Sequence, residues 1–202
     1  EYYAKTFFTT QHTFAYFFQK DFIGSYNDFK QRIDEIQSVI NIKGLDEQKQ
    51  NIINKLSYIN IITSLDTFIC DIILTKIIQD EESFNNFFNS IPPCKKKDEM
   101  TKLKEDNLVA QWEQKVIEYV MRTSYSNIDT IKDILKELFK VSIIDTNGKM
   151  KKHFYYRNLL AHRNGRKKDG GYINITNEEL KSLITDTQSI AKQIQTKIKP
   201  EH

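Results

Sequence analysis

The sequence has few of the residues that make tight turns or covalent frameworks. Its 202 residues include six glycines, three prolines and two cysteines, Cys70 and Cys94. An all-β fold needs many tight turns and therefore more glycine and proline, so their scarcity favours helices. Two cysteines in unlike surroundings do not make a disulfide framework, and no CxxC or Cys/His cluster predicts a zinc site. A reducing cytosol is the compartment that we expect.

The chain also lacks targeting and membrane signals. It contains no signal peptide and no run of eighteen uncharged apolar residues, so we expect a cytoplasmic protein that does not insert into membranes. The chain begins at Glu1 rather than Met, which indicates a trimmed chain. Glu201 and His202 resemble the remnant of an affinity tag, and we assign them no chemical role.

The common nucleotide-binding and hydrolytic motifs are missing. We find no GxxxxGK[ST], GxGxxG, HExxH or GxSxG pattern, which argues against P-loop, dinucleotide-binding, zinc-protease and serine-hydrolase chemistry. The remaining histidines, His12, His153 and His162, form no metal-ligand pair four residues apart. We therefore expect neither a metal nor another cofactor.

What the sequence does contain is helical periodicity. Charged residues make up 28% and hydrophobic residues 39%, the balance of a globular protein rather than a disordered one. From 61 to 78 the chain is apolar on nearly every side of a helix, which predicts a helix surrounded by others. The thirty residues around this run hold no glycine or proline, which favours a helix over a buried strand. The expected fold is all-α, a helical bundle around this long central helix.

Further helices are predicted on both sides of the centre. The apolar stripes and their caps place them at 1–25, 26–41, 81–89, 107–122, 127–140, 149–162 and from 176 onward. Residues 91–97, with two prolines, are expected to form a loop, and 172–175 a short extended stretch. We divide the chain into an aromatic-rich helical extension at 1–45, packed on the rest, and a helical domain at 46–200.

Positive charge is concentrated in one segment. Between 148 and 168 there are eight Lys or Arg residues and no acid, although the formal net charge of the chain is only +3. A local basic region on an otherwise mildly acidic protein favours a polyanion such as RNA as partner, while the alternative is a solvated basic turn. The residues expected to contact RNA are Lys151, Lys152, Tyr155, Tyr156, Arg163, Arg166, Lys167 and Lys168.

Within this segment, Arg157, Asn158 and His162 are suited to cleaving RNA. A guanidinium can pair with phosphate oxygens and stabilise the charge of a pentacoordinate phosphorane. An imidazole can move a hydroxyl proton at physiological pH. An amide can bind the phosphate or orient the histidine. None of these roles requires a metal.

The residues Arg157-Asn158, followed by Leu159-Leu160-Ala161 and His162, resemble the HEPN superfamily. Its ribonuclease members carry an Arg, usually followed by Asn or another polar residue, and a His after a short gap. The stretch 64–68 also resembles the second-helix signature of these domains, where an acid often lies near the site. The resemblance spans about residues 47–197. It implies an all-α fold, a catalytic Arg157, Asn158 and His162, and Asp66 as a supporting acid.

Each of these residues has an alternative interpretation. Arg157 would equally suit a structural ion pair, with a buried Asp66 as its attractive partner, and His162 a helix C-terminus. Asn158 would also suit a solvated helix surface. One of Tyr155 and Tyr156 at least is expected in the core, the other being free to stack on bases. His153 is expected at the surface.

The leading functional hypothesis is a metal-independent endoribonuclease that acts as a toxin or an anti-phage defence effector. The alternative is a non-catalytic HEPN-like module, within a larger protein, that binds RNA or dimerises. A third hypothesis is a toxin silenced by an antitoxin, by another defence-system partner or by tyrosine modification. Position 164 is Asn, however, where some relatives carry the modified Tyr. We expect a homodimer, because Arg157 and His162 point about 140° apart on a helix and would converge more easily across a two-fold axis.

Overall fold

The apolar run in the middle of the chain forms part of one unbroken helix, α3 (Glu47–Gln79). The computed structural model describes residues 16 and 19–198. Asp46 begins α3, its carboxylate accepting a hydrogen bond from the backbone N–H of Lys49 at 2.8 Å. The apolar side chains between Ile61 and Ile77 are buried in the second half of the helix. The predicted central helix is therefore confirmed.

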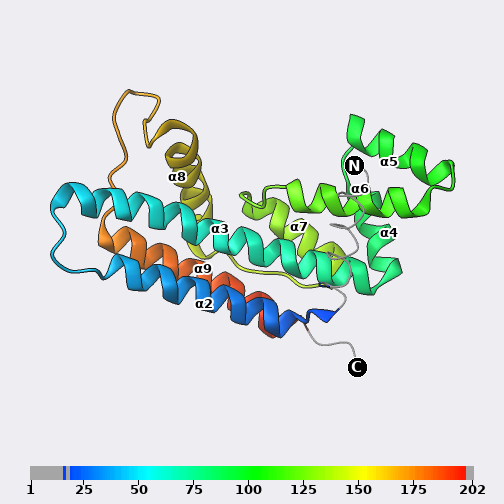
Figure 1. Ribbon diagram of the computed structural model, residues 1–202, viewed down its shortest axis with the longest axis horizontal. Helices are drawn as coiled ribbons and strands as arrows, with labels where there is room; N and C mark the ends of the chain where they lie inside the picture. Colours follow the sequence, from blue (N-terminus) through cyan, green and yellow to red (C-terminus); the bar gives the residue numbers. More distant parts are fainter. Residues whose placement is uncertain (1–15, 17–18, 199–202) are drawn as a thin grey trace, which may run out of the picture.

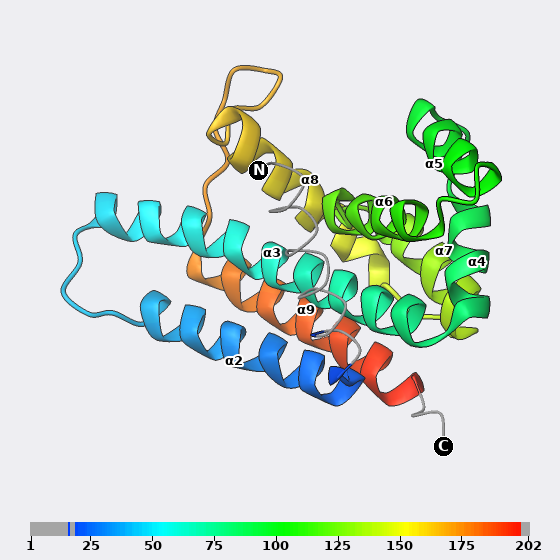
Figure 2. The same cartoon turned by 45° about the vertical axis from the view of Figure 1, so that its right-hand side comes forward.

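Two further long helices, α2 (Phe22–Ile40) and α9 (Asn177–Lys197), lie alongside α3. Figures 1 and 2 show the three helices side by side along the length of the molecule. Phe29 and Ile33 of α2 are buried against α3, so this part of the predicted 1–45 extension packs on the core. Thr176 begins α9 by accepting a hydrogen bond from the Glu179 backbone N–H at 3.2 Å, as its sequence pattern predicts.

Four shorter helices gather around the second half of α3, at the right of Figure 1: α4 (Glu81–Ser90), α5 (Lys95–Glu105), α6 (Val109–Arg122) and α7 (Ile128–Phe139). Trp112 of α6 is buried there, with the rings of Phe84 and Phe88 edge-on at 5.1 and 5.4 Å. The ammonium of Lys104 lies 4.4 Å from the Trp112 ring and ties α5 to this cluster. The result is an aromatic cluster that holds α4, α5 and α6 together.

Two local predictions in this region were wrong. Helix α5 begins at Lys95, where a loop was expected to continue, because Pro92 and Pro93 restrict the residues before and around them but not those after. Its apolar stripe is too thin to see in the sequence, with Met100 as its buried residue. Ser126 and Asp129 in the sequence resemble a capping box for the next helix, but α7 is capped by Asn127, whose side chain accepts a hydrogen bond from the Asp129 backbone N–H.

The opposite end of the molecule carries α8 (Lys149–Arg163), preceded by the short 3₁₀ helix η1 (Thr146–Gly148). Helix α8 packs on the first half of α3 and on the start of α9. Beyond it, the chain makes a loop that projects from the molecule before descending to α9 (Figure 1). Arg166 and Tyr172 form an antiparallel bridge at the base of this loop. The short extended stretch expected near Tyr172 is present.

The first half of α3 differs from the sequence expectation. The spacing of Ile52, Leu56 and Ile59 in the sequence predicts one apolar stripe on this half of the helix, which we expect to be buried. Ile52 and Leu56 are instead 52% and 55% exposed, and Ile59 is half-buried. The helix extends beyond the neighbours that cover its second half, so this part of the stripe has no described element over it. Asp66, expected to be largely buried through the same stripe, is partly buried.

Two predictions are not tested by the structure. Most of the aromatic helix predicted at 1–25, including His12, lies outside the described residues. The division of the chain at residue 45 stays a prediction. Across the described part of the chain, no helix is long and apolar enough to cross a membrane.

Candidate functional site

The predicted motif lies in the last two turns of α8. Asn158 and His162 share the exposed face of the helix, whereas Arg157 lies half-buried on its flank. One guanidinium nitrogen of Arg157 donates to the Asn158 side-chain oxygen at 3.2 Å. Arg157 and His162 are about 140° apart around the helix axis, given 3.6 residues per turn. The structure therefore joins Arg157 to Asn158 by a hydrogen bond and places Asn158 with His162 on one face, but it does not bring Arg157 and His162 together.

Arg157 does not form the structural ion pair that was its alternative interpretation. Asp66, which was the expected partner of Arg157, accepts a hydrogen bond from the backbone N–H of Tyr125 at 2.5 Å instead. No salt bridge is present between these two described side chains, and the Nε of Arg157 is buried without a hydrogen-bond acceptor. A buried donor without a partner costs free energy, so this guanidinium is not simply satisfied by the fold.

The charge of the Arg157 guanidinium nevertheless affects the pKa of Asp66. Burial raises the pKa of the Asp66 carboxyl above its usual range, while the hydrogen bond from Tyr125 and the positive charge of Arg157 both lower it. The effect of burial is the largest of the three. Asp66 and Arg157 thus belong to the same electrostatic neighbourhood, between α3 and α8, without being in direct contact.

A left-handed turn ends α8 immediately after the motif. Asn164 and Gly165 have φ values of 50° and 81°, and both of their backbone N–H groups donate to the carbonyl of Leu159. This is a helix-terminating arrangement that glycine permits and side chains disfavour. A Cβ on Gly165 would lie 3.1 Å from a side-chain carbon of Ile173, so the loop returns close against the helix end.

His162 lies in the last turn of α8, where a cation would be favoured by the helix dipole. The residue that caps the helix is Asn164, however, not His162. The His162 side chain is exposed and makes no hydrogen bond to a described residue. Its imidazole is therefore available to solvent and to a bound molecule.

The basic segment divides into a paired half and an unpaired half. Three lysines at the start of α8 form salt bridges with acids of other helices, which the sequence could not reveal: Lys149 with Asp186 at 3.4 Å, Lys151 with Asp129 at 2.9 Å and Lys152 with Glu179 at 3.0 Å. The four basic residues after the motif have no described acidic partner, and they surround a surface hollow of about 410 Å³ together with Gly170: Arg163, Arg166, Lys167 and Lys168. Positive charge is thus concentrated in the projecting loop.

The aromatic residues of this region divide into a half-buried one and two exposed ones. Tyr156 is half-buried with its ring 6.3 Å from that of Tyr58, as the expectation of one core tyrosine requires. Tyr155 is 50% exposed on the same face as Asn158. Tyr172, at the base of the projecting loop, is 62% exposed, although its sequence pattern indicated nothing beyond an extended stretch. Tyr155 and Tyr172 are therefore the aromatic side chains available for stacking.

His153 was expected at the surface, and this was wrong. It is buried, and its Nδ1 lies 2.8 Å from the Tyr58 hydroxyl while its Nε2 lies 3.0 Å from the Asp186 carboxylate. Because a carboxylate only accepts, Nε2 carries a proton and donates. Ser182 donates to the same carboxylate oxygen at 3.2 Å. This network joins α3, α8 and α9, and no local sequence pattern predicts it because its members are far apart in the chain.

The comparison with protein families decides the identity. Residues 27–200 match the family described as RiboL-PSP-HEPN. The chain belongs to this HEPN family. The match begins within α2, earlier than the residues that carried the sequence resemblance. Neither a curated protein nor a solved structure matched the chain.

Membership of the HEPN superfamily agrees with the all-helical fold and points to a nuclease or RNA-binding role. The site described above contains the side chains that either role requires. Within the described part of the chain, no group of three or more His, Cys, Asp or Glu residues is arranged to hold a metal ion.

Proposed function

We propose that this HEPN protein is a metal-independent endoribonuclease whose catalytic residues are Arg157, Asn158 and His162. The observation that carries the proposal is the state of Arg157, which lies beside Asn158 at the helix end without an acidic partner. A guanidinium that the fold does not neutralise can donate hydrogen bonds to phosphate oxygens. The unpaired basic loop that follows supplies further positive charge for the RNA backbone.

The proposed reaction uses the substrate's own 2′-hydroxyl. His162 takes part in removing the proton from this hydroxyl, and the 2′-oxygen forms a bond to the adjacent phosphorus. Arg157 stabilises the charge on the phosphorane, with Asn158 holding the guanidinium. The bond from phosphorus to the 5′-oxygen then breaks, and that oxygen takes up a proton. The products are a 2′,3′-cyclic phosphate and a 5′-hydroxyl.

The proposed active unit is a homodimer. Arg157 and His162 point about 140° apart, so a single helix α8 does not direct both at one phosphate. A two-fold axis near α8 would bring His162 of one copy towards Arg157 of the other. The exposed Ile52 and Leu56 of α3 support a dimer, because they offer an apolar surface on a helix that packs against α8. Asp66 is a supporting acid in this proposal, through its electrostatic effect on Arg157.

The proposed biological role is that of a toxin or an anti-phage defence effector in the cytoplasm. An enzyme that cuts cellular RNA must be restrained, so an antitoxin or another component of a defence system is the expected partner. Modification of a tyrosine after the motif is not part of this proposal, since Asn164 occupies that position and caps the helix.

The decisive experiment is to digest single-stranded RNA with the purified protein in excess chelator and to resolve the product ends. We expect 2′,3′-cyclic phosphate and 5′-hydroxyl ends, undiminished rates in chelator, and intact DNA of the same sequence. Arg157→Ala and His162→Ala should each lower the rate by about two to four orders of magnitude, the usual effect of losing a positioned acid–base group. Arg122→Ala, an exposed arginine at the end of α6, is the matched control and should cleave normally.

Other outcomes would exclude the mechanism in distinct ways. Products with 3′-hydroxyl ends, or activity lost in chelator, would contradict attack by the 2′-hydroxyl. Binding of RNA without any cleavage would favour the alternative, a non-catalytic HEPN module. That alternative draws support from the separation of Arg157 and His162 on one helix.

A further inference from the structure

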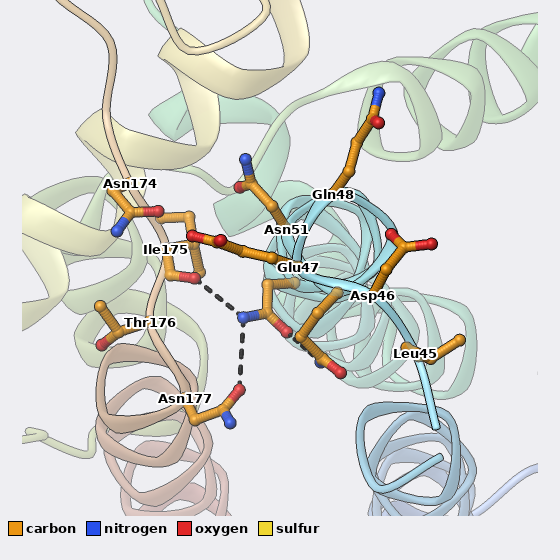
Figure 3. Close-up of a pocket in the computed structure, with 11 residues that line it drawn as sticks. Leu45, Asp46, Glu47, Gln48, Asn51, Asn174, Ile175, Thr176 and Asn177 are labelled. Atoms are coloured by element: carbon orange, nitrogen blue, oxygen red, sulfur yellow. Dashed lines mark hydrogen bonds between the residues drawn. The ribbon is translucent and has the colours of Figure 1, made fainter. Parts of the chain in front are cut away.

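A second concave surface lies at the foot of the projecting loop, away from the motif. It is an open groove of about 870 Å³ between the start of α3 and residues 174–177, which lead into α9 (Figure 3). One residue, Ile173, separates its lining residue Asn174 from the bridge between Arg166 and Tyr172 at the base of the loop. A molecule held by the basic loop can therefore reach this groove over a short distance.

The groove has an unusual lining of side-chain amides. Six of its lining residues carry one: Gln48, Gln50, Asn51, Asn54, Asn174 and Asn177. None of the described residues that line it is Lys, Arg or His. Amides offer donors and acceptors in one plane and carry no charge. The groove therefore does not suit a phosphate, which the neighbouring basic loop serves, but it suits a planar group with several hydrogen-bonding atoms.

The hydrogen-bonding groups of Asn54, at the floor of the groove, already have partners within the protein. Asn54 is buried, and its nitrogen donates to the carbonyl of Ile175 at 2.9 Å and to the side chain of Asn177 at 3.2 Å. Its oxygen accepts from Gln50 at 2.9 Å. Figure 3 marks these hydrogen bonds with dashed lines. Asn54 thus holds the two walls of the groove at a set separation and is not free to bind a ligand.

The open part of the groove has unused acceptors. The side-chain oxygen of Asn51 is buried and accepts no hydrogen bond, a state that costs free energy until a donor is supplied. Glu47 forms no salt bridge with a described residue, and Figure 3 draws its carboxylate between the amides of Asn51 and Asn174. The other acid of the rim, Asp46, is engaged with Lys49 at 2.7 Å. A ligand with N–H donors would satisfy these acceptors.

We infer that this groove binds one unstacked nucleobase that bears an amino group, at the foot of the basic projecting loop. The inference rests on the proposed RNA-cleaving function and names a specificity element for it. Cytosine, adenine and guanine each present an amino group to a carboxylate and amide edge, whereas uracil presents carbonyl oxygens in its place. The exposed Tyr172 lies along the chain between the basic residues of the loop and the residues that line the groove, so it is a candidate to stack on the same or the adjacent base.

Two oligonucleotides test this inference with minimal difference in chemistry. Twelve-residue oligocytidylate and oligouridylate have the same backbone and differ in the groups at positions 3 and 4 of the ring. Binding is measured by fluorescence anisotropy with the His162→Ala variant, so that the RNA remains intact, and integrity is checked on a gel. We expect tighter binding of the cytidylate by about 5- to 100-fold, the range for one well-placed amide or carboxylate contact to a base.

Glu47→Gln and Asn51→Leu should each reduce this ratio while leaving uridylate binding unchanged. Glu178→Gln is the matched control, because Glu178 is also an acid in the first turn of its helix but does not line the groove, so the ratio should be kept. Equal binding of the two oligonucleotides by the parent, or a ratio unaffected by Glu47→Gln and Asn51→Leu, would overturn the inference and leave the ribonuclease proposal intact. If the protein bound neither oligonucleotide, both the inference about the groove and the ribonuclease proposal would be overturned.

Discussion

At the scale of single residues, Asp66 makes the site sensitive to pH. Burial raises the pKa of its carboxyl, so over an interval above the ordinary carboxyl range the folded protein holds a proton that the unfolded chain has released. The folded state then binds more protons than the unfolded state, and stability falls as the pH rises through this interval. Asp66 therefore opposes folding when it is ionised and does so less when it is protonated.

The variant Asp66→Asn should show this directly. Asn keeps an oxygen for the Tyr125 backbone N–H but does not ionise, so its free energy of unfolding relative to the parent should increase as the pH rises past the ordinary carboxyl range. Urea unfolding at a series of pH values measures the difference, and Asp133→Asn, at an exposed position of α7, controls for the loss of one negative charge. A relative stability that decreases with rising pH would show that Arg157 outweighs burial at Asp66.

Single residues also mark where sequence reasoning succeeded and where it stopped. The local order Arg157, Asn158, His162 could be found because a motif is a property of neighbouring positions. The partners of Lys149, Lys151 and Lys152 could not, because Asp186, Asp129 and Glu179 lie on other helices. The sequence therefore overstated the free positive charge of α8, and folding restricts it to the projecting loop.

At the scale of the elements, the buried network of Tyr58, His153 and Asp186 fixes helix α8. Tyr58→Phe removes the hydroxyl that lies 2.8 Å from His153 and leaves a buried ring nitrogen without its partner. We expect a loss of about 1–3 kcal/mol in the free energy of unfolding, the cost of such an unpaired group. Urea denaturation measures it. Tyr155→Phe, at a position 50% exposed, should stay within about 0.5 kcal/mol of the parent.

Helices with broad apolar faces were predictable, and polar ones were not. Helix α3 follows from a long apolar run without glycine or proline, and α9 from its cap and stripe. Helix α5 escaped prediction because it packs mainly through Met100 and Leu103, and a thin stripe cannot be told from a polar loop. The exposure of Ile52 and Leu56 was also beyond prediction, since periodicity identifies an apolar face but not whether the same chain covers it.

At the scale of the whole molecule, a single substitution can test the proposed dimer without disrupting the fold of each copy. Leu56→Lys places a charge on the exposed stripe of α3 and should weaken self-association at least about tenfold, because an interface charge without a partner is costly. Sedimentation measures association, and RNA cleavage should fall in parallel while the circular dichroism spectrum is unchanged. Ile144→Lys, at a position 65% exposed between α7 and η1, should alter neither property. A monomeric parent that cleaves RNA fully would contradict the shared site.

The aromatic cluster around Trp112 has a consequence for how this molecule is observed. Trp112 is the single tryptophan of the chain, and it lies among α4, α5 and α6, at the end of α3 opposite to α8. Its intrinsic emission therefore monitors the end of the protein that takes no part in the proposed chemistry. Detachment of α8 would leave that signal unchanged while lowering the helical ellipticity. Whether the two transitions coincide tells whether the end that carries α8 and the end that carries the aromatic cluster unfold as one cooperative unit.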